Sequence, residues 1–216
     1  MKALCFCLAA ALCIAAPVAA KGEEPRELSW QQLAPDTGEI DNPFLKLSVE
    51  QTWTFRNYLQ QLQVPEMEHT VEQQEELRAL RAELEADGLK PDEMVVLYEE
   101  LVDKYEQAAT ATRPEILGKP VKLPGYLLPL SVQDGEVTEF LLVPTVGACI
   151  HEPPPPPNQM VYVRFEQGFK NAGLFDPVWI RGELKADERT EELYLMDGAS
   201  DVAVSYAMDA EAVWLY

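Results

Sequence analysis

The sequence is poor in basic residues. It has 17 lysine and arginine residues against 37 aspartate and glutamate residues, a formal net charge of −20 at pH 7. Proteins that bind nucleic acid or anionic lipid headgroups use clustered Lys and Arg side chains to neutralise phosphate groups. The charge balance therefore argues against both partners. Hydrophobic residues still make up 47% of the chain, so it can bury a core and is not a disordered acidic tail.

Cysteine is also scarce, and three of the four cysteines lie in the first thirteen residues. They belong to an apolar run from Ala3 to Ala16 that follows Lys2. This run is too short for the roughly 30 Å hydrocarbon core of a bilayer and is typical of a signal peptide, which we expect to be cleaved after Ala20. Neither Cys7 nor Cys13 follows a small residue, as a lipoprotein cleavage site would require.

Cleavage at that position leaves Cys149 as the single cysteine, so an intramolecular disulfide is excluded even in an oxidising compartment. No other apolar stretch approaches the length of about 18 residues that a transmembrane helix needs. A short, alanine-rich signal suggests a bacterial export route. The sequence therefore predicts an exported periplasmic protein without a transmembrane segment in the mature chain.

The remaining chain divides into three segments by pattern: an extended polar arm at residues 21–47, a helical region at 48–112 and a β domain at 117–216, all after the signal peptide at 1–20. Capping boxes and a proline at a first helical position indicate three helices. The second and third are separated only by a short turn around Gly88. Because helices joined by a short turn usually pack antiparallel, these two are expected to form a helical hairpin.

The β domain contains five short runs of β-branched and apolar residues bounded by turn residues. The runs lie at 121–128, 137–143, 161–165, 178–184 and 202–206. Five short strands, with glycines where strands must bend, predict a small OB-like β-barrel, and a small β-sandwich is the alternative. The expected fold class is α+β.

Motifs of the common enzyme classes are missing. There is no G-x-S-x-G, no H-E-x-x-H, no phosphate-binding loop and no C-x-x-C. A Cys–His pair can act as an activated nucleophile. A lone thiolate in an oxidising compartment, with no second cysteine to resolve it, would however be prone to oxidation. We therefore expect no catalysis.

Most of the chemical information lies in one segment between two predicted strands, which reads G-A-C-I-H-E-P-P-P-P-P-N-Q. Consecutive prolines fix φ near −65° and form a stiff polyproline II rod, here of roughly 15 Å. The segment can serve as a structural brace or as a binding loop presented to a partner. The candidate binding-loop residues are Gly147, Pro153, Pro154, Pro155, Pro156, Pro157, Asn158 and Gln159.

The same segment suggests a metal site. Residues at i and i+2 of an extended chain project to one side, so the Cys149 thiolate and the His151 imidazole can converge on one ion. These two ligands suit zinc or copper. A site needs at least one more ligand, for which Glu152 and Glu139 are the candidates, and His69 is the only other histidine. The alternative is that Cys149 is a buried structural residue.

Three stretches carry a resemblance to a known family: G-K-P-V-K-L-P-G-Y-L-L-P-L at 118–130, T-E-F-L-L-V-P at 138–144 and the Cys-His-polyproline segment at 147–159. Over about residues 117–185 the chain resembles a bacterial domain-of-unknown-function family of exported proteins, some of them lipoproteins. The resemblance implies no activity. It implies a gene neighbourhood, because some members are encoded beside MacB-like ABC transporters and beside periplasmic proteins linked to zinc supply.

Two main functions are consistent with these observations. The first is a periplasmic accessory protein that binds a transition metal for, or alongside, an ABC transport system. The second is a non-catalytic interaction module that presents the rigid polyproline loop to another periplasmic protein. The acidic surface also raises a third idea, the binding of cationic peptides or polyamines.

Overall fold

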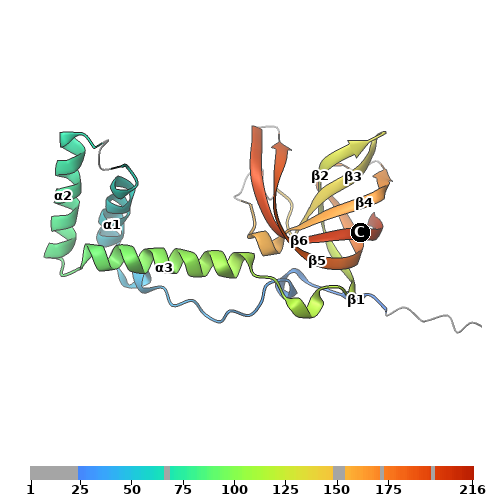
Figure 1. The fold of residues 1–216 in the computed structure, drawn as a ribbon, viewed down its shortest axis with the longest axis horizontal. Coiled ribbons are helices and arrows are strands. Elements are labelled where there is room, and N and C mark those ends of the chain that lie inside the picture. Colours follow the sequence, from blue (N-terminus) through green and yellow to red (C-terminus); the bar gives the residue numbers. More distant parts are fainter. Residues whose placement is uncertain (1–23, 66–68, 148–153, 171–172, 196–197) are drawn as a thin grey trace, which may run out of the picture.

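The computed structural model describes residues 24–65, 69–147, 154–170, 173–195 and 198–216. These residues form three α-helices and a six-stranded sheet, which confirms the expected α+β class. Helices and strands occupy opposite ends of an elongated molecule, and helix α3 (Pro91–Thr110) runs between them (Figure 1). In the described part of the chain, no helix combines the length and the hydropathy needed to cross a membrane.

The first two helices begin where their capping boxes predict. In α1 (Val49–Leu62) the Ser48 hydroxyl accepts from the Gln51 backbone N–H at 3.1 Å, and the Gln51 side chain accepts from the Ser48 N–H at 3.0 Å. In α2 (Val71–Ala86) Thr70 and Gln73 repeat this exchange. Each box satisfies two backbone donors that the helix itself cannot.

The helical hairpin differs from the expected one, because α2 pairs with α1 and not with α3. The Thr54 hydroxyl donates to Glu83 at 2.9 Å and the Gln61 amide donates to Glu76 at 3.1 Å, which sets an antiparallel register between α1 and α2. Contacts between α2 and α3 are few. The reason lies in the turn: Gly88 has a φ of 76°, which ends α2, and Pro91 then starts α3 in a new direction (Figure 1).

An aromatic cluster joins α1, α3 and the arm that precedes them. The rings of Phe44 and Phe55 stack with centroids 5.3 Å apart, and Tyr98 of α3 meets Phe55 edge-on at 6.2 Å. Phe55 and Tyr58 are buried against Leu80 of α2. The helical region thus has a small core of its own.

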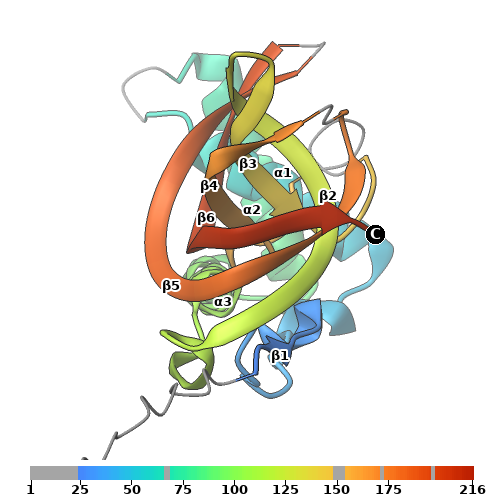
Figure 2. The same ribbon diagram turned by 90° about the vertical axis from the view of Figure 1, so that its right-hand side faces the viewer.

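The strands form a closed circuit of pairings. Strand β2 (Pro120–Gln133) pairs with β3 (Glu136–Val143), and β3 pairs with β4 (Val161–Lys170). Strand β6 (Gly198–Leu215) lies parallel to β4 and antiparallel to β5 (Asp176–Leu195), and β5 returns to β2 (Figure 2). All five expected strands are present, and the last two are much longer than the apolar runs that predicted them.

Alternate residues of all five strands gather in one buried cluster, which identifies the inner face of the circuit. Its members include Leu123, Leu127, Phe140, Leu142, Val161, Val163, Val178, Ile180, Leu184 and Tyr206. Gly182 lies at a register shift between β5 and β6, where a Cβ would come within 2.7 Å of the Asp209 carbonyl oxygen. A glycine is needed there because the two backbones approach so closely.

The end of β5 and the start of β6 pair as a hairpin, from Arg189 to Val204, which contributes to a second hydrophobic cluster. Leu193, Val202 and Val204 from this hairpin are buried with Leu141 of β3 and Met160, which precedes β4. The hairpin therefore covers part of the outer face of the strands. A second register shift, between Ala186 and Arg189, marks its start.

The polar arm contributes to the core of the strand region. Strand β1 (Arg26–Glu27) pairs with β2 in parallel, and Leu28 and Leu33 are buried in the inner cluster. The Tyr206 hydroxyl donates to the Leu33 carbonyl at 2.6 Å and accepts from the Arg113 N–H at 2.7 Å. One buried hydroxyl of β6 thus fixes both the arm and the segment that follows α3.

Candidate functional site

The Cys-His-polyproline segment begins and ends at well-defined points. Gly147 follows β3 with a φ of 85°, a conformation that favours glycine. Pro154 and Pro156 are exposed, and Pro156 has polyproline II angles, with φ −52° and ψ 146°. Pro157 then opens a 3₁₀ turn through Gln159.

Four of the predicted site residues lie outside the described residues. These are Cys149, His151, Glu152 and Pro153. The metal site predicted from Cys149 and His151, with Glu152 as a possible further ligand, therefore remains a prediction, as does the place of Pro153 in the binding loop.

Asn158 anchors the segment to the helical region. It is 2% exposed, and its amide nitrogen donates to the Ala108 carbonyl at 2.8 Å and to the Ala111 carbonyl at 3.0 Å. Both carbonyls belong to the C-terminal end of α3, where the last backbone acceptors have no partner inside the helix. Gln159 in turn donates to the Asn158 carbonyl. The end of the predicted binding loop is thus a helix cap that connects the two ends of the molecule.

Glu139, the second candidate for a third metal ligand, already has partners. One carboxylate oxygen lies 3.6 Å from Arg164 Nε, across the β3–β4 pair. Burial raises the pKa of the Tyr162 hydroxyl, and a hydrogen bond with Glu139 raises it further. A metal at Glu139 would therefore have to share this carboxylate with Arg164 and Tyr162.

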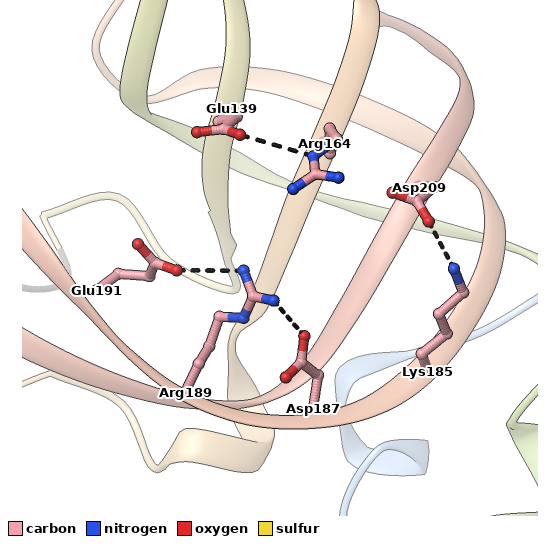
Figure 3. Close-up of polar contacts among 7 residues, drawn as sticks. All are labelled: Glu139, Arg164, Lys185, Asp187, Arg189, Glu191 and Asp209. Atoms are coloured by element: carbon pink, nitrogen blue, oxygen red, sulfur yellow. Dashed lines mark hydrogen bonds and ion pairs between the residues drawn. The ribbon is translucent and has the colours of Figure 1, made fainter.

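The Glu139–Arg164 pair belongs to a charged lattice on the outer face of β3, β4, β6 and β5 (Figure 3). Lys185 donates to Asp209 at 2.5 Å. This bond lowers the pKa of Asp209 and raises that of Lys185. Arg164 and Lys185 thus each face a carboxylate of a neighbouring strand.

Arg189 is the central residue of the hairpin side of this lattice. Its guanidinium pairs with Asp187 at 2.5 Å and with Glu191 at 3.3 Å (Figure 3). It also lies 4.2 Å from the centroid of the Tyr162 ring. A cation held over an aromatic face and between two carboxylates is well placed to fix the hairpin on β4. The sequence A-D-E-R-T-E at 186–191 could have predicted this cluster, because Asp187, Arg189 and Glu191 alternate and so share one face of a strand. It was missed because the predicted strand ended at Leu184.

The second histidine lies in the helical region. The His69 ring is 3.1 Å from the Gln61 carbonyl and lines a cleft of about 720 Å³ between the three helices, together with Tyr58, Leu77 and Arg81. Arg81 pairs with Asp92 of α3 and Glu85 of α2. Among the described residues, no group of three His, Cys, Asp or Glu side chains could hold a metal ion, here or elsewhere.

The comparisons with known proteins support one part of the resemblance, membership of a family of unknown function. The family model of DUF3299, described as a protein of unknown function, matches residues 30–214. The crystal structure of a DUF3299 family protein from Pseudomonas aeruginosa PAO1, determined at 2.45 Å resolution, is 27% identical in sequence. That match covers 90% of this chain and 97% of the other, with a TM-score of 0.49. No curated protein matches the sequence. The chain therefore belongs to the DUF3299 family of proteins of unknown function.

Proposed function

We propose that the protein is an exported, non-catalytic accessory protein that presents the loop of residues 147–159 to a partner protein in the periplasm. The observation that carries this proposal is the burial of Asn158, whose two hydrogen bonds fix one end of the loop to α3. A segment anchored in this way, here Pro154–Gln159, loses less conformational entropy when a partner docks on it than a free segment would. An ABC transport system is the partner that the family resemblance suggests.

The strand arrangement supports an OB-like barrel as the scaffold of this loop. The last strand, β6, lies between β4 and β5 and parallel to β4, while β5 closes back on β2. OB folds share this arrangement of five strands, and they bind ligands along the face of the second and third strands. In this chain those strands are β3 and β4, and the loop connects them.

The loop proposal can be tested by photo-crosslinking in cells. A photoreactive amino acid replaces Pro154 or Pro156, which are exposed, and the control position is Glu106, which is exposed on α3. Both loop positions should give the same discrete crosslinked product in the periplasmic fraction, and Glu106 should not give it. The proposal is wrong if all three positions give the same products, or if the protein is not found in the periplasm.

The second candidate function is the binding of zinc or copper, and the spacing of Cys149 and His151 favours it. Calorimetric titration of reduced protein, residues 21–216, with zinc tests it. Cys149→Ala and His151→Ala should each abolish tight binding, and His69→Ala is the matched control. Affinity should fall as the pH drops, because the ligands must be deprotonated. Unchanged binding in either site variant would reject the metal site.

Thiol labelling separates the two candidates further. A purely structural Cys149 predicts slow reaction with a thiol reagent unless denaturant is present. Fast labelling of the native protein, slowed by added zinc, would favour the metal site.

A further inference from the structure

Three aromatic side chains form a row where β5 and β6 run past each other. Trp179 of β5 lies directly opposite Trp214 of β6, with ring centroids 6.4 Å apart and planes 12° from parallel. Tyr216 also stacks on Trp179, with ring centroids 5.6 Å apart and planes 9° from parallel. Trp214 is 39% exposed and Tyr216 75% exposed. Neither the loop nor the charged lattice described above uses this row.

The row lies on the outer face of the strands. Val178 and Ile180, the neighbours of Trp179 in the chain, are fully buried in the inner cluster, so the alternation along β5 directs Trp179 outward. Trp179 stacks with both other rings and is half-buried, so the ring surface open to a flat ligand belongs to Trp214 and Tyr216. Trp214 stands on a regular strand, so it needs no rearrangement before a ligand packs against it.

Paired charges border the row. The Lys122 ammonium lies 5.0 Å from the centroid of the Trp179 ring and 2.9 Å from Glu27. Arg181 lies 3.3 Å from Glu211, two residues from Trp179 along β5. These pairs place N–H donors and carboxylate acceptors beside the rings without adding net charge.

This combination matches the chemistry of a sugar. One face of a pyranose ring carries C–H groups that pack on the electron-rich face of an aromatic ring. Its hydroxyl groups both donate and accept hydrogen bonds, which suits a border that offers donors and acceptors in pairs. The net charge of −20 disfavours a polyanion such as single-stranded nucleic acid, the other ligand that stacks on aromatic rows. We propose that Trp179, Trp214 and Tyr216 form a binding site for a neutral glycan.

Calorimetry with chitohexaose, cellohexaose and maltohexaose tests the proposal on the mature chain. At least one should bind, and Trp214→Ala and Tyr216→Ala should each weaken its binding roughly tenfold, the effect expected for the loss of one aromatic stacking contact. The matched control is Trp53→Ala, because Trp53 is 61% exposed on α1, away from the strands, and should leave binding unchanged. Raising the salt concentration should have little effect, since the ligand is uncharged.

Other outcomes would overturn the site. They are no binding of any of the three glycans, an equal loss in the Trp53 variant, or preferential binding of oligo-dT or a proline-rich peptide to the same rings. Trp214→Phe keeps a ring and should retain most of the affinity, so it tests the site even if the alanine variant unfolds. These results do not depend on the loop, so they can fail or succeed separately from the proposed function.

Discussion

At the scale of single residues, Asn158 and Tyr206 show how polar side chains hold distant segments together. Each satisfies two backbone groups from other parts of the chain. Removing such a side chain leaves buried partners without a hydrogen bond, which costs more than the bond itself contributes.

Asn158→Ala should lower the free energy of unfolding by roughly 1–3 kcal/mol, because two carbonyls at the end of α3 lose their donor. Urea denaturation measures this. Asn158→Asp should be worse, since it places a negative charge against carbonyl oxygens at a helix C-terminus. Gln159→Ala is the control, and its effect should be smaller. Equal effects of Asn158→Ala and Gln159→Ala would show that the cap has little energetic importance.

Tyr206→Phe should also cost about 1–3 kcal/mol, because the Leu33 carbonyl and the Arg113 N–H lose their partner. The matched control is Tyr105→Phe, whose side chain is exposed on α3 and should change stability by less than about 0.5 kcal/mol.

Tyr206→Phe should also change how the free energy of unfolding depends on pH above about pH 10. Burial raises the pKa of the Tyr206 hydroxyl, against the smaller effect of its hydrogen bond with Arg113. Above about pH 10 the unfolded chain releases this proton while the folded protein keeps it, so the free energy of unfolding falls as the pH rises toward the folded pKa. Urea midpoints measured up to the alkaline limit should fall less steeply for Tyr206→Phe than for wild type. Parallel curves would contradict this.

At the scale of elements, the helical region illustrates the difference between apolar packing and surface ion pairs. Phe55 is 4% exposed and stacks on Phe44. The Arg81–Asp92 pair connects α2 to α3, but both side chains are well exposed, at 42% and 72%.

Phe55→Ala should therefore destabilise the helical region by about 3–5 kcal/mol, whereas Asp92→Asn should cost less than about 1 kcal/mol. Far-ultraviolet circular dichroism during urea denaturation compares the two. The reasoning fails if the ion-pair variant is the less stable one.

The elements themselves were largely predictable, and their partners were not. Capping boxes and the proline at Pro91 mark helix starts through local hydrogen bonds, so the sequence reveals them. The pairing of α2 with α1 depends on the direction in which the chain leaves Gly88, which no local pattern specifies. The extra length of β5 was missed because residues 185–192 are mostly polar, and most of them are held in the strand by backbone pairing. Likewise the hydrogen bonds made by Asn158 and Tyr206 depend on contacts between distant segments.

At the scale of the whole molecule, the excess of acidic residues should destabilise the folded state. Net charge of one sign causes self-repulsion that salt screens. Eleven ion pairs among the described residues act in the opposite direction, but they are mostly exposed and individually weak.

We expect the repulsion to dominate, so adding sodium chloride at pH 7 should raise the melting temperature. Differential scanning calorimetry at low and moderate ionic strength measures the shift, with a neutral osmolyte as the control for general solvent effects. A lower melting temperature in salt would mean that the ion pairs outweigh the net charge.

The hydrogen bond between Tyr206 and Leu33 joins residues 173 positions apart in the chain. The arm, β2 and β6 must therefore meet before the inner core is complete. Contacts of such high sequence separation slow folding, because a long loop must close before they form. A chain that lacks β6 would leave the Leu33 carbonyl without its hydrogen-bond donor and the inner cluster without Tyr206. Slow folding is therefore the expected kinetic consequence of placing the arm's hydrogen-bond donor in the last strand of the chain.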